Sequence, residues 1–197
     1  MSNPDARYQK SRAAIIDASI QLLLSNPDAS MSEIALAAGV GRATLYRHYE
    51  TRSELLNELV MLCLEETDLA LQPIKEQGLR GLEAIVRSID LIAPLTDRFR
   101  FLMNASGLTT LDRRVTRRYQ QQLDELVGYV EEAKQTGDIA QTLPTAWVVA
   151  SYDALLNAAW MLVQQGTLSS CDATEAFKAS FVSSLQDRRA PRNDGTT

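Results

Sequence analysis

The chain has 197 residues, of which 45% are hydrophobic and 23% are charged, and its formal net charge is −5. This composition is that of an ordinary globular protein, and the acidic balance argues against broad, nonspecific binding to polyanions. Cys63 and Cys171 are the only cysteines and form no spaced pair, so neither a zinc site nor a disulfide framework is indicated. We expect two reduced thiols in helical packing, no metal and no cofactor.

The distribution of apolar residues bears on location and on fold class. No apolar run reaches the roughly 18 residues that span a bilayer, and the first residues lack the apolar core of a signal peptide. These features predict a cytoplasmic protein. No alternating strand pattern occurs, whereas apolar residues recur at helical spacing along the chain. We therefore predict an all-α fold of about nine helices.

The first part of the chain contains an arm, a helix and a short connection. Residues 1–9 are polar and are interpreted as a mobile arm, and residues 10–25 show the apolar spacing of a helix. In the connection that follows, Asn26 is expected to adopt a left-handed conformation, and Pro27 prevents the helix from continuing.

Residues 30–49 contain two short helical patterns that are separated by two glycines. Ser30 and Glu33 have the spacing of a capping box, in which each side chain accepts a hydrogen bond from the other residue's backbone N–H. Gly39 stands where the first helix must end in a left-handed conformation, which glycine adopts without steric cost. Gly41 precedes the second helix but has no side chain to cap it. This arrangement predicts a helix-turn-helix motif.

The second helix of the motif, over residues 42–49, divides into a buried side and an outward edge. At about 100° per residue, Leu45 and Tyr49 fall within ~40° of one another and mark the buried side. The opposite edge is centred on Arg47. Helices that enter a DNA major groove show this division, because the tip meets base edges and the flanks meet phosphates.

The outward residues have the chemistry that such a helix requires. The arginines can fork onto guanine, and the alanine and threonine methyl groups can touch a thymine methyl. The tyrosine, histidine and hydroxyl groups can donate to phosphate oxygens, and an arginine that begins the next helix favours an anion. We predict DNA contacts from Ser32, Arg42, Ala43, Thr44, Tyr46, Arg47, His48 and Arg52.

The run from Ile34 to Leu56 resembles the DNA-binding domain of the TetR family of bacterial regulators. The family's pattern is matched by Ile34, Ala35, Ala38, Gly39, Val40, Thr44, Leu45, Tyr46, His48, Tyr49, Arg52, Leu55 and Leu56. The resemblance covers residues 12 to about 59. It implies an N-terminal three-helix DNA-binding domain, assigned with the arm to residues 1–51, and a helical ligand-binding and dimerisation domain over residues 52–188. The segment 189–197 lacks core-forming residues and is expected to be disordered.

The sequence of the second domain predicts a series of helices. Their expected ranges are 52–76, 82–92, 94–104, 111–135, 144–165 and 172–187, with Asp172 as the cap of the last. Residues 144–165 leave almost no polar face, which indicates burial on all sides and, in a chain this small, burial against a second copy. The resemblance implies a homodimer through the last two helices, and a two-fold pair of reading helices about 34 Å apart fits a palindromic operator.

The mechanism that the resemblance favours is a repressor released from DNA by a small-molecule effector. Aromatic, aliphatic and amide side chains on the middle helices are candidates to line the effector pocket. They are Phe99, Met103, Tyr119, Leu123, Tyr152, Asn157 and Trp160. Plain core packing is the competing interpretation for each of them, because aromatic residues at helical spacing usually pack together.

Two other classes of function compete with a DNA-binding regulator. A helical enzyme is disfavoured, because a single histidine, no glycine-rich phosphate loop and no metal-ligand spacing leave little for chemistry. A non-enzymatic protein that keeps the fold but acts through a protein partner is the alternative. Binding to DNA that flanks the protein's own gene separates this alternative from a regulator.

Overall fold

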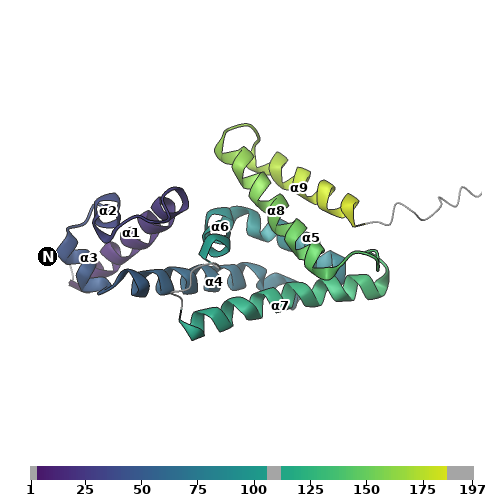
Figure 1. The fold of residues 1–197 in the computed structure, drawn as a ribbon, viewed down its shortest axis with the longest axis horizontal. Helices are drawn as coiled ribbons and strands as arrows, with labels where there is room; N and C mark the ends of the chain where they lie inside the picture. The colour runs from purple at the N-terminus through teal and green to yellow at the C-terminus, as the bar shows by residue number, and fades with distance from the viewer. Residues whose placement is uncertain (1–3, 106–111, 186–197) are drawn as a thin grey trace, which may run out of the picture. The chain divides into compact units, whose positions relative to one another are not determined.

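All the secondary structure of the described residues, 4–105 and 112–185 of a computed structural model, is helical, which confirms the predicted all-α class (Figure 1). In chain order the elements are α1 Pro4–Ser25, α2 Met31–Ala37, α3 Arg42–His48, α4 Arg52–Glu76, α5 Gly81–Ile92, the 3-10 turn η1 Ala93–Leu95, α6 Thr96–Ala105, α7 Arg113–Thr136, α8 Thr145–Gln164 and α9 Ser170–Ser184. The expected nine α-helices are thus all present in this part of the chain, and α4 has the predicted bounds.

The start of α1 differs from the prediction. The helix begins at Pro4 rather than near residue 10, so the interpretation of residues 1–9 as an arm is wrong for residues 4–9. Proline is favoured in the first turn of a helix, and Asp5 places a carboxylate near the positive end of the helix dipole. These two residues explain why polar sequence is helical here.

Two other local predictions are also corrected. Every described residue with a positive φ is a glycine, so Asn26 does not take the left-handed conformation. The last helix begins two residues earlier than expected, because the hydroxyl of Ser169 accepts the backbone N–H of Asp172 at 3.1 Å. Asp172 therefore lies inside the first turn of α9, where its charge favours the helix dipole.

The chain forms two compact units, and α4 and α7 each continue from one into the other. Unit 1 comprises residues 1–69 and 97–120, and unit 2 comprises residues 70–96 and 121–197. The assignment of functions to residues 1–51 and 52–188 stays a prediction, and the proposed tail, 189–197, lies outside the described residues.

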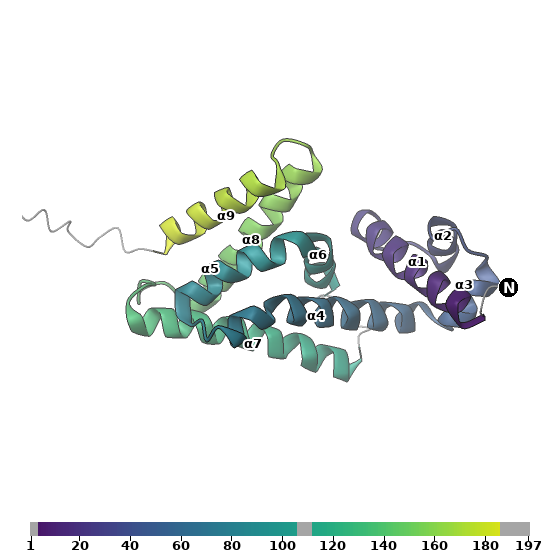
Figure 2. The same cartoon turned by 180° about the vertical axis from the view of Figure 1, so that it is seen from behind.

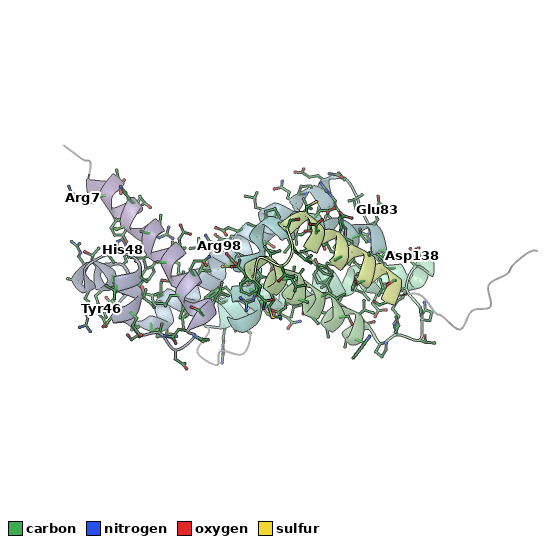
Figure 3. All side chains as sticks on the ribbon, turned by 90° about the horizontal axis from the view of Figure 1, so that it is seen from above. Arg7, Tyr46, His48, Glu83, Arg98 and Asp138 are labelled. Carbon is green, nitrogen blue, oxygen red and sulfur yellow. The ribbon has the colours of Figure 1, made fainter. Side chains whose placement is uncertain are left out.

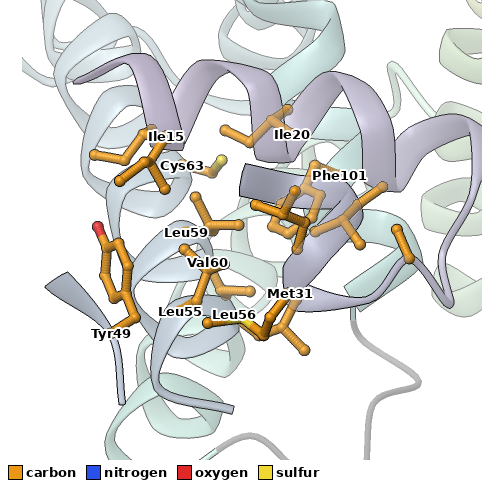
Figure 4. Close-up of a cluster of buried hydrophobic side chains, with 14 of the residues drawn as sticks. Ile15, Ile20, Met31, Tyr49, Leu55, Leu56, Leu59, Val60, Cys63 and Phe101 are labelled. Carbon is orange, nitrogen blue, oxygen red and sulfur yellow. The ribbon is translucent and has the colours of Figure 1, made fainter. Parts of the chain in front are cut away.

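Unit 1 is larger than the predicted DNA-binding domain, residues 1–51, because segments distant in sequence share its core (Figure 4). The buried side chains of α1, α2 and α3 meet the first half of α4, including Leu55, Leu59 and Cys63. Phe101 of α6 and Val115 of α7 join the same cluster. A core that recruits α6 and α7 cannot be inferred from local periodicity, since it depends on contacts between residues far apart in sequence.

Ion pairs fasten α6 to the other helices of unit 1. The guanidinium of Arg98 donates from Nη2 to Oδ1 of Asp17 at 2.6 Å and from Nε to Oε2 of Glu66 at 3.0 Å. Gln21 of α1 also donates to the Asp97 carboxylate at 2.9 Å. The beginning of α6 is thus held to α1 and α4 by polar contacts as well as by the buried core.

In unit 2, α8 and α9 form a helical hairpin whose two members lie side by side in both views (Figures 1 and 2). Tyr152 of α8 packs edge-on against Phe177 and Phe181 of α9, with ring centroids 5.2 and 5.6 Å apart. The Tyr152 hydroxyl lies 2.8 Å from the Ser88 hydroxyl of α5. This aromatic cluster joins three helices of the unit.

Within a single chain, α8 is not buried on all sides. Its buried side chains are Val148, Tyr152 and Leu156, whereas Trp147 is 64% exposed and Met161 is 42% exposed. By length and composition alone, α8 is also long and apolar enough to cross a membrane, which one helix of a soluble protein's core can equally satisfy. The helix is nevertheless not an uninterrupted apolar run, because Ser151, Asp153 and Asn157 lie within it.

Candidate nucleic-acid interface

The helix-turn-helix is built by the caps and turn that the sequence predicts. The N–H of Glu33 donates to Ser30 Oγ at 3.3 Å, and the N–H of Ser30 donates to Glu33 Oε2 at 2.7 Å, which completes the capping box. The Ser30 N–H, and then the Ser30 hydroxyl, which also donates to Glu33 Oε2 at 2.7 Å, lower the pKa of the Glu33 carboxyl. Gly39 has φ +63°, and Gly41 precedes α3 as its N-cap without a side-chain hydrogen bond, as expected.

Helix α3 has the two predicted faces. Leu45 and Tyr49 are buried in unit 1, at 0% and 1% exposure, and Tyr46 is 47% exposed. Arg42, Ala43 and Arg47 are exposed as well, while Thr44 is half-buried and its Oγ1 accepts from Arg47 Nη2 at 3.1 Å. The outward edge is therefore polar and basic, and a rigid apolar face supports it from behind.

His48 lies differently from the phosphate-facing flank that was predicted for it. Its Nε2 is 2.8 Å from Ser11 Oγ, and its ring stacks on Tyr8 with centroids 4.1 Å apart. Burial, and then the charges of Arg47 and Arg12, lower the pKa of the imidazole, which favours the neutral ring at pH 7. The ring packs α3 against α1, and a direct phosphate contact from it stays a prediction that this geometry does not favour.

Arg52 is also engaged within the protein. Its Nε donates to the carbonyl oxygen of Ala29 at 3.1 Å, and its Nη2 donates to that of Pro27. The side chain thus braces the connection between α1 and α2 from the first turn of α4. Ser32 is half-buried in the first turn of α2. The predicted phosphate contacts of these two residues remain untested.

Tyr8 and Ser11 contact the recognition helix from α1, a role that the sequence pattern does not predict. Tyr8 lies in the polar segment 1–9, which is typical of an arm, and Ser11 lies two residues after it. The helix-start signal at Pro4 and Asp5 could have revealed them, because a helix that begins there places residues 8 and 11 on one face.

The candidate effector residues do not form one described cluster. Tyr119 packs on the core of unit 1, whereas Tyr152, in unit 2, is 2% exposed and belongs to the aromatic cluster. In the same unit, Leu123 and Trp160 are half-buried and Asn157 is exposed. The side chains of Phe99 and Met103 lie outside the described part of the structure. For Tyr152 the competing interpretation, core packing, fits the contacts.

The remaining chemistry of the described residues is modest. Among them, no group of three or more histidine, cysteine or acidic side chains is placed to hold a metal ion. Cys63 is buried, and burial raises the pKa of its thiol to about 12, while Cys171 is exposed and free. Cys63 thus packs in a helical core as predicted, whereas Cys171 lies on the surface of the chain.

Comparison with known proteins places this interface in a family. The family model described as bacterial regulatory proteins, tetR family, matches residues 15–59, which include both helices of the motif. The HTH-type transcriptional repressor LfrR of Mycolicibacterium smegmatis is 45% identical over 51 residues, a match that spans 26% of this chain and 27% of that protein. An uncharacterized HTH-type transcriptional regulator of Haemophilus influenzae is 29% identical over 140 residues, or 64% of this chain and 66% of that protein.

The fold similarity extends over nearly the whole chain. The crystal structure of LfrR from Mycobacterium smegmatis in complex with proflavine aligns with a TM-score of 0.69 and 23% sequence identity, and the match covers 91% of this chain and 98% of that one. The family model matches only residues 15–59, while the similarity of fold extends over most of the chain. Residues 15–59 thus match the DNA-binding domain of the bacterial regulatory proteins of the tetR family, and the chain as a whole has a TetR-like fold.

Proposed function

We propose that the protein is a cytoplasmic, dimeric, sequence-specific DNA-binding regulator of transcription, and that it represses until a small-molecule effector releases it from a palindromic operator. The observation that supports this most directly is the outward edge of α3. Arg42, Tyr46 and Arg47 are exposed along it, while Leu45 and Tyr49 anchor the opposite face in the core. An edge of this kind can meet base edges and phosphates without rearrangement of the protein.

The net charge of the chain favours sequence-specific binding over general binding to DNA. At −5 overall, the protein has little general attraction for DNA, so binding must come from the local basic edge and from shape. We therefore expect discrimination among sequences rather than coating of any duplex. Repression is the favoured direction because LfrR, a relative with 45% identity over 51 residues, is named a repressor.

The dimer is proposed from the exposed apolar surface of α8. Trp147 and Met161 lie on a helix whose most apolar stretch is only 17% buried within the chain. Exposed apolar surface of this extent is typical of a site that another molecule covers. A second copy is the favoured occupant, because a two-fold axis would also present two recognition helices to a palindrome.

An effector site in the helical body is proposed by analogy with LfrR, which was crystallised with proflavine. The candidates that keep this role are Phe99, Met103, Tyr119, Leu123, Asn157 and Trp160. Binding of an effector would shift the population between DNA-binding and released forms by the difference in its affinity for the two, and by no more than that.

The decisive test is DNA binding by Tyr46→Ala. Fluorescence anisotropy with labelled duplex from the region that flanks the protein's own gene should show binding by the wild type that weakens steeply with salt. Tyr46→Ala should weaken it by about 10-fold, since Tyr46 is the exposed aromatic of the outward edge. Tyr46→Phe distinguishes the contribution of the hydroxyl to DNA affinity from that of the ring.

The controls keep the outcomes distinct. The circular dichroism spectrum and unfolding midpoint of Tyr46→Ala should match the wild type, because its side chain is not part of the core. Loss of binding without loss of structure supports the proposed interface. Wild-type protein that binds no duplex at low salt would favour the alternative, a protein that keeps the fold and acts through a protein partner.

A further inference from the structure

The first two turns of α1 lie next to the recognition helix, α3, and precede the part of α1 that packs in the core. Arg7 and Tyr8 lie in these turns and are exposed, Tyr8 at 46%. Ser11, one turn further on, is half-buried against α3. In Figure 3, Arg7 and Tyr46 stand at the same end of unit 1, with His48 between them. The beginning of α1 is therefore next to the edge that is proposed to face DNA.

His48 fixes the position of Tyr8 against α3. The Tyr8 and His48 rings stack with centroids 4.1 Å apart at 35°, and Ser11 Oγ lies 2.8 Å from His48 Nε2. Ser11 also donates to the carbonyl oxygen of Tyr8 at 2.9 Å, which uses its single hydroxyl proton. It follows that His48 Nε2–H donates to Ser11 Oγ and that the neutral ring carries no proton on Nδ1.

One turn later, an ion pair between Arg12 and Glu58 holds α1 to α4. The orientation of α1 about its own axis is thus set on two sides, by His48 of α3 and by Glu58 of α4. A side chain on the flank of α1 next to α3 is consequently held in a defined direction. Such a side chain can contribute to binding at a lower entropic cost than one on a mobile arm.

The helical wheel identifies which basic residue lies on that flank. The direction from α1 to α3 lies midway between Tyr8 and Ser11, and at about 100° per residue Arg7 is roughly 70° from it, whereas Lys10 is roughly 130° from it. Arg7 lies on the side of α1 that faces away from the Arg12–Glu58 pair. Neither Arg7 nor Lys10 takes part in an ion pair of the described structure, so both charges are available.

We propose that Arg7 and Tyr8 of α1 form a second anchor, which binds a phosphate of the DNA backbone beside the groove that receives α3. Arg7 supplies charge, the Tyr8 hydroxyl donates a hydrogen bond, and His48 is a positioning residue that holds the Tyr8 ring. The inference rests on the proposed DNA-binding function and adds contacts that lie outside the helix-turn-helix. The phosphate contact first predicted for His48 passes in this arrangement to the residue that His48 supports.

The test compares three variants by fluorescence anisotropy on the duplex used above, over a series of salt concentrations. Tyr8→Phe keeps the ring stacked on His48 and removes only the hydroxyl, and it should weaken binding by about 10-fold. Arg7→Gln should weaken binding and reduce the slope of log K against log salt by about one. Lys10→Gln removes the same charge one turn further along α1, at a position about 60° around the helix from Arg7 and further from α3, and is the matched control.

Lys10→Gln should change affinity by less than about 2-fold and leave the salt slope unchanged. If Tyr8→Phe and Arg7→Gln are no weaker than Lys10→Gln while Tyr46→Ala still loses affinity, the α1 anchor is wrong and the proposed function stands. Wild-type protein that binds no duplex overturns both. The unfolding midpoints of all three variants should equal that of the wild type, since each changed atom is on the surface.

Discussion

Asp153 is a carboxylate set among the apolar residues of α8. Burial raises the pKa of its side chain to about 6 and is the sole cause of the shift. In the unfolded chain the same carboxyl has its ordinary pKa of 3.8. Between these two values the folded protein binds more protons than the unfolded protein, so stability falls as pH rises through about 6.

Asp153→Asn should therefore stabilise the protein at pH 7.5, by about 1–2 kcal/mol after allowance for the partly solvated position. The gain should shrink as the pH is lowered below 6 and vanish only at about pH 3 and below, where the wild-type carboxyl is protonated in both the folded and the unfolded states. Urea unfolding at a series of pH values measures both. A gain that is independent of pH would mean that burial of the charge is not the cause.

His48 and Arg52 show how a side chain's chemistry and its setting can diverge. Both have the groups that bind phosphate, and both match the family pattern. In the structure, however, His48 contacts Ser11 and Tyr8, and Arg52 donates to backbone carbonyls of the connection that precedes α2. These partners come from α1 and its loop, which are distant in sequence, so periodicity within the motif could not reveal them.

Among the elements, the junction of α5 and α7 depends on a glycine. Gly81 begins α5 with φ +52°, and a Cβ placed on it would lie 3.4 Å from backbone atoms of Ala133 in α7. Its N–H donates to the Glu132 carboxylate at 3.2 Å. The conformation favours the absence of a side chain, whereas an added Cβ would only come to ordinary van der Waals distance from Ala133.

Gly81→Ala should lower the free energy of unfolding by about 1–2 kcal/mol, the usual cost of a left-handed conformation for a residue with a Cβ. Gly128→Ala is the matched control: Gly128 lies inside α7 with no atom within 4 Å of an added Cβ. It should raise the free energy by about 0.5–1 kcal/mol through helix propensity. Urea denaturation distinguishes the two, and equal effects would contradict the strain argument.

The helices of unit 1 show which element boundaries local sequence can predict. Helix α4 has the expected bounds, and the capping box and left-handed Gly39 are as predicted, because each is set by residues within one turn. The predicted start of α1 and the predicted cap of α9 are wrong. In both places several polar residues have a similar propensity to begin or cap a helix, so the local sequence does not single out one of them. The inclusion of α6 in unit 1, through Phe101 and the ion pairs of Arg98, has no local signal.

For the whole molecule, the exposed apolar side of α8 is the feature that a single chain leaves unexplained. Trp147→Glu should give a monomer in sedimentation velocity at concentrations where the wild type is a dimer, because a charge would be desolvated at the proposed interface. The ring is 64% exposed in one chain, so the helical content should be preserved. Leu69→Glu, which makes the same kind of change at a residue 69% exposed on α4, should leave the dimer intact.

A folded Trp147→Glu protein that still sediments as the wild-type dimer would place the interface elsewhere. A wild-type chain that stays in solution only with detergent would instead point to insertion of α8 into a membrane. Both outcomes can be read in one experiment, because sedimentation reports mass and solubility together.

The sequence by itself determined the helical class, the helix-turn-helix with its caps, the two faces of α3 and the resemblance of residues 12–59 to the TetR DNA-binding domain, because each follows from residues within a few positions of one another. Tertiary structure alone decided which outward side chains are free for a ligand, how far unit 1 extends and which surface of α8 stays open. Hydrogen bonds and buried contacts between distant helices set these features, since a side chain's reach and exposure depend on neighbours that the local pattern does not contain.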